Sequence, residues 1–523
     1  MISGKKQIIC RTITLLLSSC VLTIANAAAT AVTTPAERIA KVAEVDLERE
    51  AKIQPAPLIT FETISFRSGD LLGIPKAKQF QDTIMKAMES AYKTNPDILA
   101  QRAALRAADE AIVQAKAGWR PKLNATISGG YGKTYNKGDT INNSQAAGGN
   151  PALVSDKGTH SAQLQLTQNL YNGGATVAQT ESAKANIKAQ RAALIETEQG
   201  TLFTAIQAYL DLITQLAQLE VLRANENFLK ITLQSTQDKF NVGEETRTSV
   251  AQAEAQQAEA IAKRQSAEAQ LAAKIATYTQ VTGRAPGKLQ KPEVPKGLPK
   301  SVKQALDQAR LNNPTVLKAQ YTEIAARRKV DEFNAGLLPK LDLVGTSSAE
   351  KTRSLNNLAG TPAGLGPTTS STNDTTVNHQ VTLNLTFPLY EAGSVRSQKR
   401  QAIESAEQTR IQIEGALRKI EQQLIAAFQK FEAAQSNLKY YKEQVLANEI
   451  SVEGTKQEML VGSKILLDVL NAQNKLLDAQ LSLVQVEQTL YISAYQIMVL
   501  MGMLTAKYMQ LQVEHYDPTL HYQ

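Results

Sequence analysis

Four segments of the chain alternate apolar with polar side chains. They cover residues 123–131, 162–171, 341–347 and 380–390. A period of two is typical of strands that have one apolar and one polar face. The first and last segments show it most clearly, with apolar or small positions at Leu123, Ala125, Ile127, Gly129, Tyr131, Val381, Leu383, Leu385 and Phe387. Polar segments at about 134–160 and 350–378 separate the members of each pair, and we expect them to be loops.

Between and after the strand pairs, the pattern changes to that of long helices. From Asn172 to Phe240, after the initial Gly173-Gly174, only Gly200 interrupts a helical sequence, which corresponds to roughly 100 Å at about 1.5 Å per residue. Glycines follow at Val242-Gly243 and Val461-Gly462, where the chain is expected to turn and return as a second helix. A heptad pattern, which predicts side-by-side packing, connects Ile413, Leu417, Ile420, Leu424, Ala427, Phe431, Ala434, Leu438, Tyr441 and Val445.

These elements occur twice. LTQNLYNGGA contains Tyr171 and LTFPLYEAGS contains Tyr390, which are 390 − 171 = 219 positions apart. Asn95-Pro96 and Asn313-Pro314 differ by 313 − 95 = 218, and each pair lies in a helix that is expected to open its copy and to end before a proline. The chain is therefore a duplicated half-molecule, and each half carries two strands and a long helical hairpin.

The repeat fixes the expected boundaries. A signal peptide is predicted at residues 1–27, from the cations Lys5, Lys6 and Arg11, an apolar stretch and the site Ala25-Asn26-Ala27. An alternative is a lipoprotein box at residues 17–20, which would acylate Cys20. The remaining segments are an N-terminal extension of unknown role at 28–81, a first repeat at 82–300, a second repeat at 301–505 and a C-terminal tail at 506–523.

Composition excludes several function classes. The formal net charge is +8, and removal of the three signal-peptide cations leaves +5. Both signs are mixed along the chain without a dense basic block, which argues against a nucleic-acid partner. Both cysteines, Cys10 and Cys20, lie in the signal peptide, so no disulfide, thiol nucleophile or cysteine metal site is expected. The histidines fall in expected polar loops or the tail without a metal-binding motif, and no catalytic motif is present; we expect neither an enzyme nor a cofactor. They are His160, His379, His515 and His521.

No stretch after residue 27 has the roughly twenty apolar residues of a transmembrane helix, so a membrane would be crossed by strands. Membrane barrels need about eight strands, and one chain supplies four. Three chains would close a twelve-stranded barrel with threefold symmetry. On periodicity alone, a soluble antiparallel sheet remains an alternative.

Each copy enters its strands through RPKL or LPKL, leaves them through LTQNLYNGG or LTFPLYEAG, and turns at VGEETRTSVAQAEA or VGSKILLDVLNAQ. With these motifs, the two copies resemble the outer membrane efflux protein family, the TolC-like ducts. The resemblance covers about residues 82–505. It implies an α+β membrane protein in the outer membrane of a Gram-negative cell: a homotrimer whose twelve-stranded β-barrel continues as a twelve-helix coiled-coil α-barrel. It also implies a periplasmic adaptor, an inner-membrane ABC or RND-type transporter that supplies the energy, contact with outer membrane lipid, and export of drugs or of proteins by type I secretion.

The same resemblance implies a gate at the periplasmic hairpin tips. The family's pore Asp matches Asp468, and its second acidic ring falls on the neutral Asn471. The latch Arg falls on Lys464, the latch Tyr on Met459, and the first-hairpin Asp on Ser249. The closed state is therefore expected to be held differently, with Glu244, Glu245 and Arg247 as candidate substitutes. Adaptor contacts are expected at the tips, at Val242, Gly243, Glu244, Glu245, Arg247, Val461 and Gly462.

Each strand exit is interpreted as the junction at which a strand becomes a helix. Pro388 removes a ladder donor and is expected to set the backbone for helix entry. Gly174 and Gly393 are expected to ease close packing there or to serve as turn residues, next to Tyr171 and Tyr390. Two other function classes stay open: a passive outer membrane porin, and a secreted coiled-coil structural protein.

Overall fold

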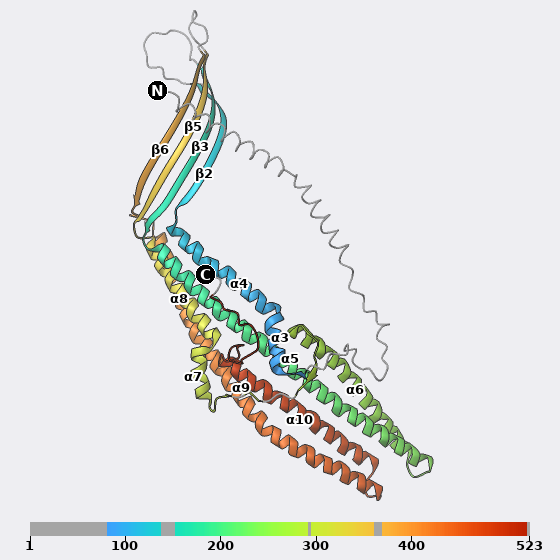
Figure 1. The fold of residues 1–523 in the computed structure, drawn as a ribbon. Coiled ribbons are helices and arrows are strands. Elements are labelled where there is room, and N and C mark those ends of the chain that lie inside the picture. Colours follow the sequence, from blue (N-terminus) through green and yellow to red (C-terminus); the bar gives the residue numbers. More distant parts are fainter. Residues whose placement is uncertain (1–80, 138–151, 291–293, 296, 360–368, 520–523) are drawn as a thin grey trace, which may run out of the picture. The chain divides into compact units, whose positions relative to one another are not determined.

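The computed structural model describes residues 81–137, 152–290, 294–295, 297–359 and 369–519 (Figure 1). The predicted signal peptide, Cys20 and nearly all of the N-terminal extension lie outside these residues. Within the described part of the chain, no helix combines the length and apolar character that a membrane crossing requires.

All four predicted strands are present, and they form one antiparallel sheet in the order β2-β3-β5-β6 (Figure 1). The central contact, β3 with β5, joins the two repeats. The expectation of long polar loops is wrong, because the strands extend far into those segments and pair there through their backbones. Their bounds are β2 Lys122–Lys137, β3 Ala152–Asn172, β5 Lys340–Ala359 and β6 Thr369–Thr386.

The register puts the four apolar faces on the same side of the sheet. One row of paired residues runs Leu123, Leu166, Gly345 and Val381 across the four strands. Since side chains alternate along a strand, the odd positions of β2, β5 and β6 share a face with the even positions of β3, up to the register shift between Asn169 and Tyr171. The opposite face carries rows of amides and hydroxyls such as Thr126, Gln163, Ser348 and Asn378.

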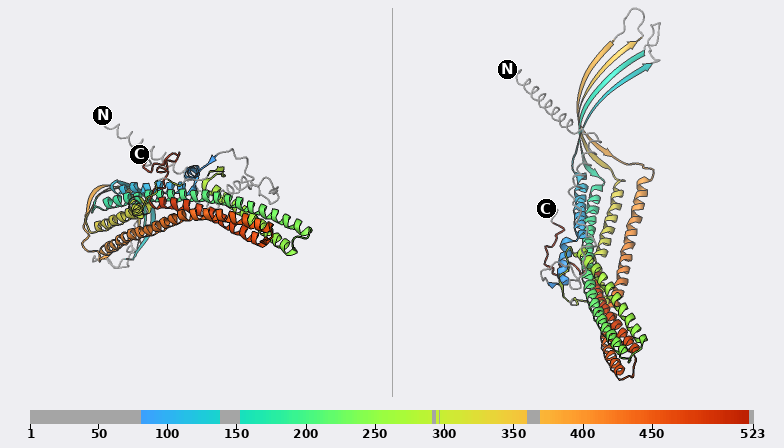
Figure 2. Two further views of the ribbon diagram at one scale, coloured as in Figure 1. Left: turned by 90° about the horizontal axis from the view of Figure 1, so that it is seen from below. Right: turned by 90° about the vertical axis from the view of Figure 1, so that its right-hand side faces the viewer.

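The long hairpins are also confirmed. In the first, α5 (Ala175–Asn241) is followed by α6 (Arg247–Thr282); in the second, α9 (Ser394–Leu460) is followed by α10 (Leu466–Leu500). Both α5 and α9 have 67 residues. The two hairpins lie side by side, with α5 next to α10 (Figure 2). Every position of the predicted heptad in α9 is buried or half-buried.

The prediction of one helix through each Asn-Pro pair is wrong. Each pair separates two helices: α3 (Ile84–Thr94) from α4 (Pro96–Lys116), and α7 (Val302–Asn312) from α8 (Pro314–Ala335). Proline at the first helical position lacks the N–H that a continuing helix would use. The Asn95 and Asn313 side chains instead accept hydrogen bonds from the backbone N–H groups of Asp97 (2.8 Å) and Thr315 (2.9 Å) and so begin the second helices.

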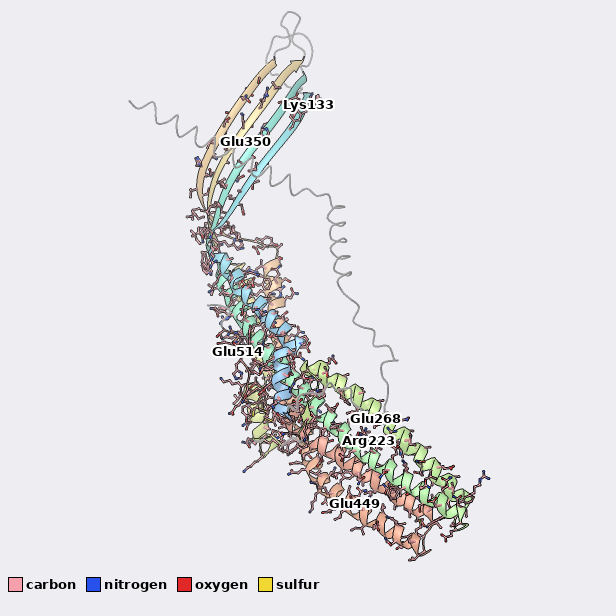
Figure 3. The ribbon with its side chains drawn as sticks, turned by 45° about the vertical axis from the view of Figure 1, so that its right-hand side comes forward. Lys133, Arg223, Glu268, Glu350, Glu449 and Glu514 are labelled. Carbon is pink, nitrogen blue, oxygen red and sulfur yellow. The ribbon has the colours of Figure 1, made fainter. Side chains whose placement is uncertain are left out.

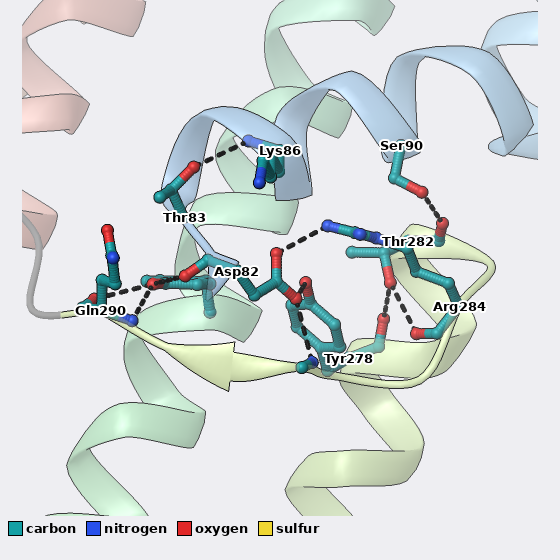
Figure 4. A network of polar contacts seen from close by, with 10 residues as sticks. Asp82, Thr83, Lys86, Ser90, Tyr278, Thr282, Arg284 and Gln290 are labelled. Carbon is teal, nitrogen blue, oxygen red and sulfur yellow. Dashed lines mark hydrogen bonds and ion pairs between the residues drawn. The ribbon is translucent and has the colours of Figure 1, made fainter. Parts of the chain in front are cut away.

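A second, two-stranded sheet pairs β1 (Gln81–Asp82) with β4 (Lys288–Leu289) beside the helices. Asp82 is 1% exposed. Its carboxylate accepts hydrogen bonds from Tyr278 Oη (2.8 Å) and Arg284 Nη2 (2.6 Å) (Figure 4). The Tyr209 hydroxyl lies 2.7 Å from the Gln290 carbonyl oxygen in the same network. These contacts tie the start of the described chain to the connection after α6.

Candidate functional site

The two hairpin tips share one backbone geometry. Gly243 and Gly462 have φ of 82° and 78°, the left-handed region that favours glycine. The N–H of Glu244 donates to the Lys239 carbonyl at 2.9 Å, and the N–H of Ser463 donates to the Glu458 carbonyl at the same distance. A six-to-one bond of this kind, closed by a left-handed glycine, ends a helix and satisfies its last carbonyl groups. The predicted turns are therefore confirmed.

The tips differ in how their second helices begin. In the first hairpin, Thr246 Oγ1 accepts a hydrogen bond from the N–H of Ser249 (3.1 Å). The equivalent residue in the second hairpin is Ile465, which has no side-chain acceptor. There the carboxylate of Asp468 accepts from the N–H of Ile465 (3.3 Å). Each tip thus forms one half of the reciprocal pair of bonds that can cap a helix.

An apolar cluster packs the two tips against each other. Its buried members are Leu229 of α5, Ala253 and Ala260 of α6, and Leu466 and Leu470 of α10. Burial of a leucine side chain contributes about 1.5–3 kcal/mol. Met459, which by the family resemblance is expected at the position of the latch Tyr, is half-buried against this cluster and contributes apolar packing there.

The polar and charged candidates at the tips are exposed or half-buried in the single chain. Lys464, Asn471, Glu244 and Arg247 are exposed, and Asp468 is half-buried. Ser249 and Glu245 are also half-buried, and the Ser249 hydroxyl lies 3.0 Å from Thr246 Oγ1. Among the described residues of one chain, none of Glu244, Glu245 and Arg247 forms an ion pair with a partner at the tips. Their role as latch substitutes stays a prediction.

Sequence reasoning missed a buried amide pair between the hairpins. Gln473 of α10 donates to Asn225 of α5 at 2.9 Å, and both side chains are more than nine-tenths buried. The signal was present: Gln473 stands in the apolar series Leu466, Leu470, Leu477 at steps of four, three and four. A polar residue in a heptad core position commonly fixes the register of packed helices.

Ion pairs connect the two helices of the first hairpin. Arg264 of α6 contacts Glu226 of α5 (2.5 Å) and Glu268 (2.8 Å), and Arg223 of α5 contacts Glu268 (3.0 Å) (Figure 3). Burial alone would raise the pKa of Glu268, but the two guanidinium groups together lower it. Because these side chains are partly exposed, we assign them alignment of α5 and α6 more than stability.

At the strand-to-helix junctions, the close-packing role expected of Gly174 and Gly393 is wrong. A Cβ at either position would meet nothing within 4 Å, but their φ values of 87° and 81° favour glycine, in agreement with the turn alternative. The close approach belongs to Gly173, where a Cβ would lie 2.5 Å from the Ala335 carbonyl oxygen. Sequence reasoning missed this residue.

The role expected of Pro388 at helix entry is also wrong. β6 ends at Thr386 and α9 begins at Ser394, so Pro388 lies in the irregular connection between them. In the first repeat the strand continues through Tyr171 to Asn172, and α5 follows almost at once. Tyr171 is 45% exposed and Tyr390 is 88% exposed, so neither tyrosine is part of the helical core.

No group of three or more potential metal ligands occurs among the residues that the structure describes. The expectation that His160 and His379 lie in loops is wrong, because they belong to β3 and β6. His379 Nδ1 lies 2.9 Å from Ser347 Oγ of the neighbouring strand. This contact joins two strands and gives no sign of a reactive site.

The family model, the curated relatives and the solved structures that match this chain agree with one another. The model of the family described as "Outer membrane efflux protein" matches residues 87–284 and 305–503. The chain is 32% identical to the outer membrane efflux protein BepC of Brucella suis over 442 residues, which cover 84% of this chain and 90% of the relative. It is 25% identical to the outer membrane protein TolC of Escherichia coli over 81% of this chain and 83% of the relative. The outer membrane channel CmeC of Campylobacter jejuni has the same fold, with a TM-score of 0.65, 16% identity, and coverage of 80% and 85%.

Proposed function

The chain belongs to the outer membrane efflux protein family and locates to the outer membrane of a Gram-negative cell, and we propose that it acts there as the trimeric exit duct of a tripartite export system. In this function the duct receives its cargo from an inner-membrane ABC or RND-type transporter and a periplasmic adaptor. The inner-membrane transporter supplies the energy for export. The cargo is drugs and other small molecules or, in type I secretion, proteins.

The two-faced sheet with open edges carries the proposal. Ile127 and Val381 of the apolar face are 86% and 77% exposed in the single chain, while the other face is polar. Strands β2 and β6 each pair with only one neighbour among the described strands. Unpaired backbone groups are not tolerated in hydrocarbon. Three copies would pair β2 of one chain with β6 of the next and close a twelve-stranded barrel, with the apolar face toward lipid and the polar face toward the lumen.

The helices support the same assembly. Four hairpin helices per chain, in three chains, would continue the barrel as a twelve-helix tunnel, and α5 or α9 alone spans about 100 Å. Apolar side chains remain exposed along α9 in the single chain, including Ile411 (58%), Tyr440 (63%) and Ile450 (67%). Such a row is expected to be covered by a neighbouring copy.

The gate is assigned to the hairpin tips. Three copies of Asp468 around a narrow opening would attract cations and repel anions, and the adjacent Lys464 would reduce the effect. Asn471 adds no charge, and Met459 adds apolar packing between the tips. The tips, at 242–247 and 461–462, also offer the contact surface for the adaptor.

Single-channel recording and native mass spectrometry of the detergent-extracted protein test this function. The expected results are the mass of three chains and a small, fluctuating, cation-preferring conductance. A large, steady conductance would indicate a passive porin instead. A protein that inserts into no bilayer would indicate a soluble coiled-coil structural protein.

A further inference from the structure

A small surface groove lies where the helices of the first repeat meet the sheet. Lys116, Trp119 and Arg120, at the end of α4 and in the short 3-10 helix η2 (Ala117–Trp119), line one side of it. The α5 residues Val177, Thr180 and Glu181 line the other side, and the cavity volume is about 380 Å³. We name this surface the Trp119 groove. None of its lining residues belongs to the hairpin tips to which the gate is assigned.

The backbone around Trp119 is held in place from two directions. Gln168 Nε2 of β3 donates a hydrogen bond to the Trp119 carbonyl oxygen at 2.8 Å. A Cβ at Gly118 would lie 2.8 Å from Thr176 Oγ1 of α5, so glycine allows η2 to pack closely on that helix. The backbone that carries the indole is therefore held against both the sheet and α5, and the Trp119 residue is 45% exposed.

The groove adjoins the start of the apolar sheet face. Leu123, four residues after Trp119, is 67% exposed, and Ile127 follows on the same face. An apolar ring with a polar N–H favours the boundary between hydrocarbon and water. If the apolar face contacts lipid, as the proposed function requires, Trp119 lies at the level of the headgroups on the periplasmic side.

The charge of the groove is positive. Lys116 and Arg120 are exposed, and neither forms an ion pair with another described residue of the chain. The carboxylate in the groove, Glu181, is already paired with Lys184 at 2.6 Å, and this contact lowers the pKa of Glu181. Glu181 therefore does not neutralise the two cations. A guanidinium and an ammonium group beside an interfacial indole suit a phosphate on a lipid.

We propose that the Trp119 groove binds the headgroup of an anionic phospholipid in the periplasmic leaflet, with Arg120 and Lys116 on the phosphate and Trp119 against the upper acyl chain. This inference rests on membrane insertion as given under the proposed function. The second repeat does not duplicate the groove, because Leu337 and Leu338 occupy the positions of Trp119 and Arg120 at the offset of 218. One chain therefore carries one such site, and a trimer carries three.

The chain contains a single tryptophan, so its fluorescence reports on this groove alone. The purified full-length protein is inserted into phosphatidylcholine vesicles that contain a minor fraction of phosphatidylglycerol, and one of the two lipids carries brominated acyl chains. Brominated phosphatidylglycerol is expected to quench Trp119 more strongly than an equal fraction of brominated phosphatidylcholine. The double variant Lys116→Gln/Arg120→Gln should lower the preference for phosphatidylglycerol about thirtyfold, because each cation near an anionic surface contributes about 1 kcal/mol.

The matched control is Lys303→Gln/Arg310→Gln, which removes the same two charge types from exposed positions of α7. It should retain the preference of the parent protein. Equal quenching by both lipids in the parent would overturn the lipid site while leaving the exit duct intact, because single-channel conductance would persist. An unchanged preference in the Lys116/Arg120 variant would also overturn it. Absence of quenching by either lipid, together with absence of conductance, would contradict the membrane function itself.

Discussion

Asp468 and Ile465 form the helix start at the second hairpin tip, through a 3.3 Å hydrogen bond from the Ile465 N–H to the Asp468 carboxylate. The residue proposed to place charge in the pore therefore also begins a helix. Capping needs only a side-chain oxygen, whereas cation preference needs the charge. Two substitutions at one position can separate these roles.

Asp468→Asn keeps the acceptor and removes the charge, and Asp468→Ala removes both. We expect both variants to lose cation preference in single-channel recordings. Both variants lose the favourable interaction of the charge with the helix dipole, at about 0.3–1 kcal/mol. Only the alanine variant should also lose the hydrogen bond to the Ile465 N–H, at a further cost of about 1 kcal/mol. Asp307→Asn, an exposed charge on α7, is the control and should change neither property. Unaltered selectivity in both Asp468 variants would remove Asp468 from the pore.

The helix start at the first hairpin tip can be tested in the same way. Thr246→Val keeps the side-chain shape but removes the oxygen that accepts from Ser249, at a cost of about 1 kcal/mol. Hydrogen exchange of the peptide covering residues 242–256 should accelerate about fivefold, because local opening becomes easier. Thr248→Val, at an exposed position two residues on, should leave the rate unchanged. Similar rates in both variants would show that the cap does not limit opening of the tip.

The buried carboxylate of Asp82 allows a stability test. Asp82→Asn leaves Arg284 without its counter-charge. The expected loss is about 3 kcal/mol, near the lower end for a broken buried pair, because the Arg284 side chain is 36% exposed. Tyr278→Phe removes one hydrogen bond and should cost about 1–2 kcal/mol. Urea denaturation followed by circular dichroism measures both, and an equal loss in the two variants would contradict the importance of the charge.

The raised pKa values of buried tyrosines predict that the protein loses stability at alkaline pH. Burial raises the pKa of Tyr209 and of Tyr495 to about 12, from 10.0 for a free tyrosine. Above pH 10 the unfolded chain therefore releases protons that the folded chain retains, so stability falls by about 1.4 kcal/mol per pH unit for each such tyrosine up to about pH 12. Tyr495→Phe should make the decline of Tm between pH 9 and 11.5 less steep. A parallel decline in the variant would exclude Tyr495 as a cause.

Gly200 is the one glycine within α5, and a Cβ there would meet nothing within 4 Å. Gly200→Ala should stabilise the protein by about 0.5–1 kcal/mol, because alanine restricts the unfolded chain and favours the helix. Gly243→Ala, at a φ of 82°, should destabilise it. Thermal melting of the two variants should therefore shift in opposite directions. A lower Tm for Gly200→Ala would show that a neighbouring copy packs closely on that position.

Much of this architecture follows from the sequence because it depends on neighbours along the chain. The alternation in 123–131 and 380–386, the heptads of α9 and the left-handed glycines Gly243 and Gly462 are local patterns, and each appears in the structure as predicted. The expected strand at 380–390 ends earlier than predicted, at Thr386. Because the sequence repeats, the same elements could then be expected in both halves. The errors are also local: polar strands were interpreted as loops, and the effect of Asn-Pro pairs on a helix was missed.

Only the tertiary structure decided which distant groups meet. The pairing of β3 with β5 placed four apolar faces on one side of one sheet, although either repeat alone shows only a strand pair. Asp82 meets Arg284 across 202 positions, and Asn225 meets Gln473 across 248. No periodicity specifies such partners. Burial in a shared interior selects them, because a polar group removed from water must find a hydrogen-bonding partner wherever packing brings one within reach.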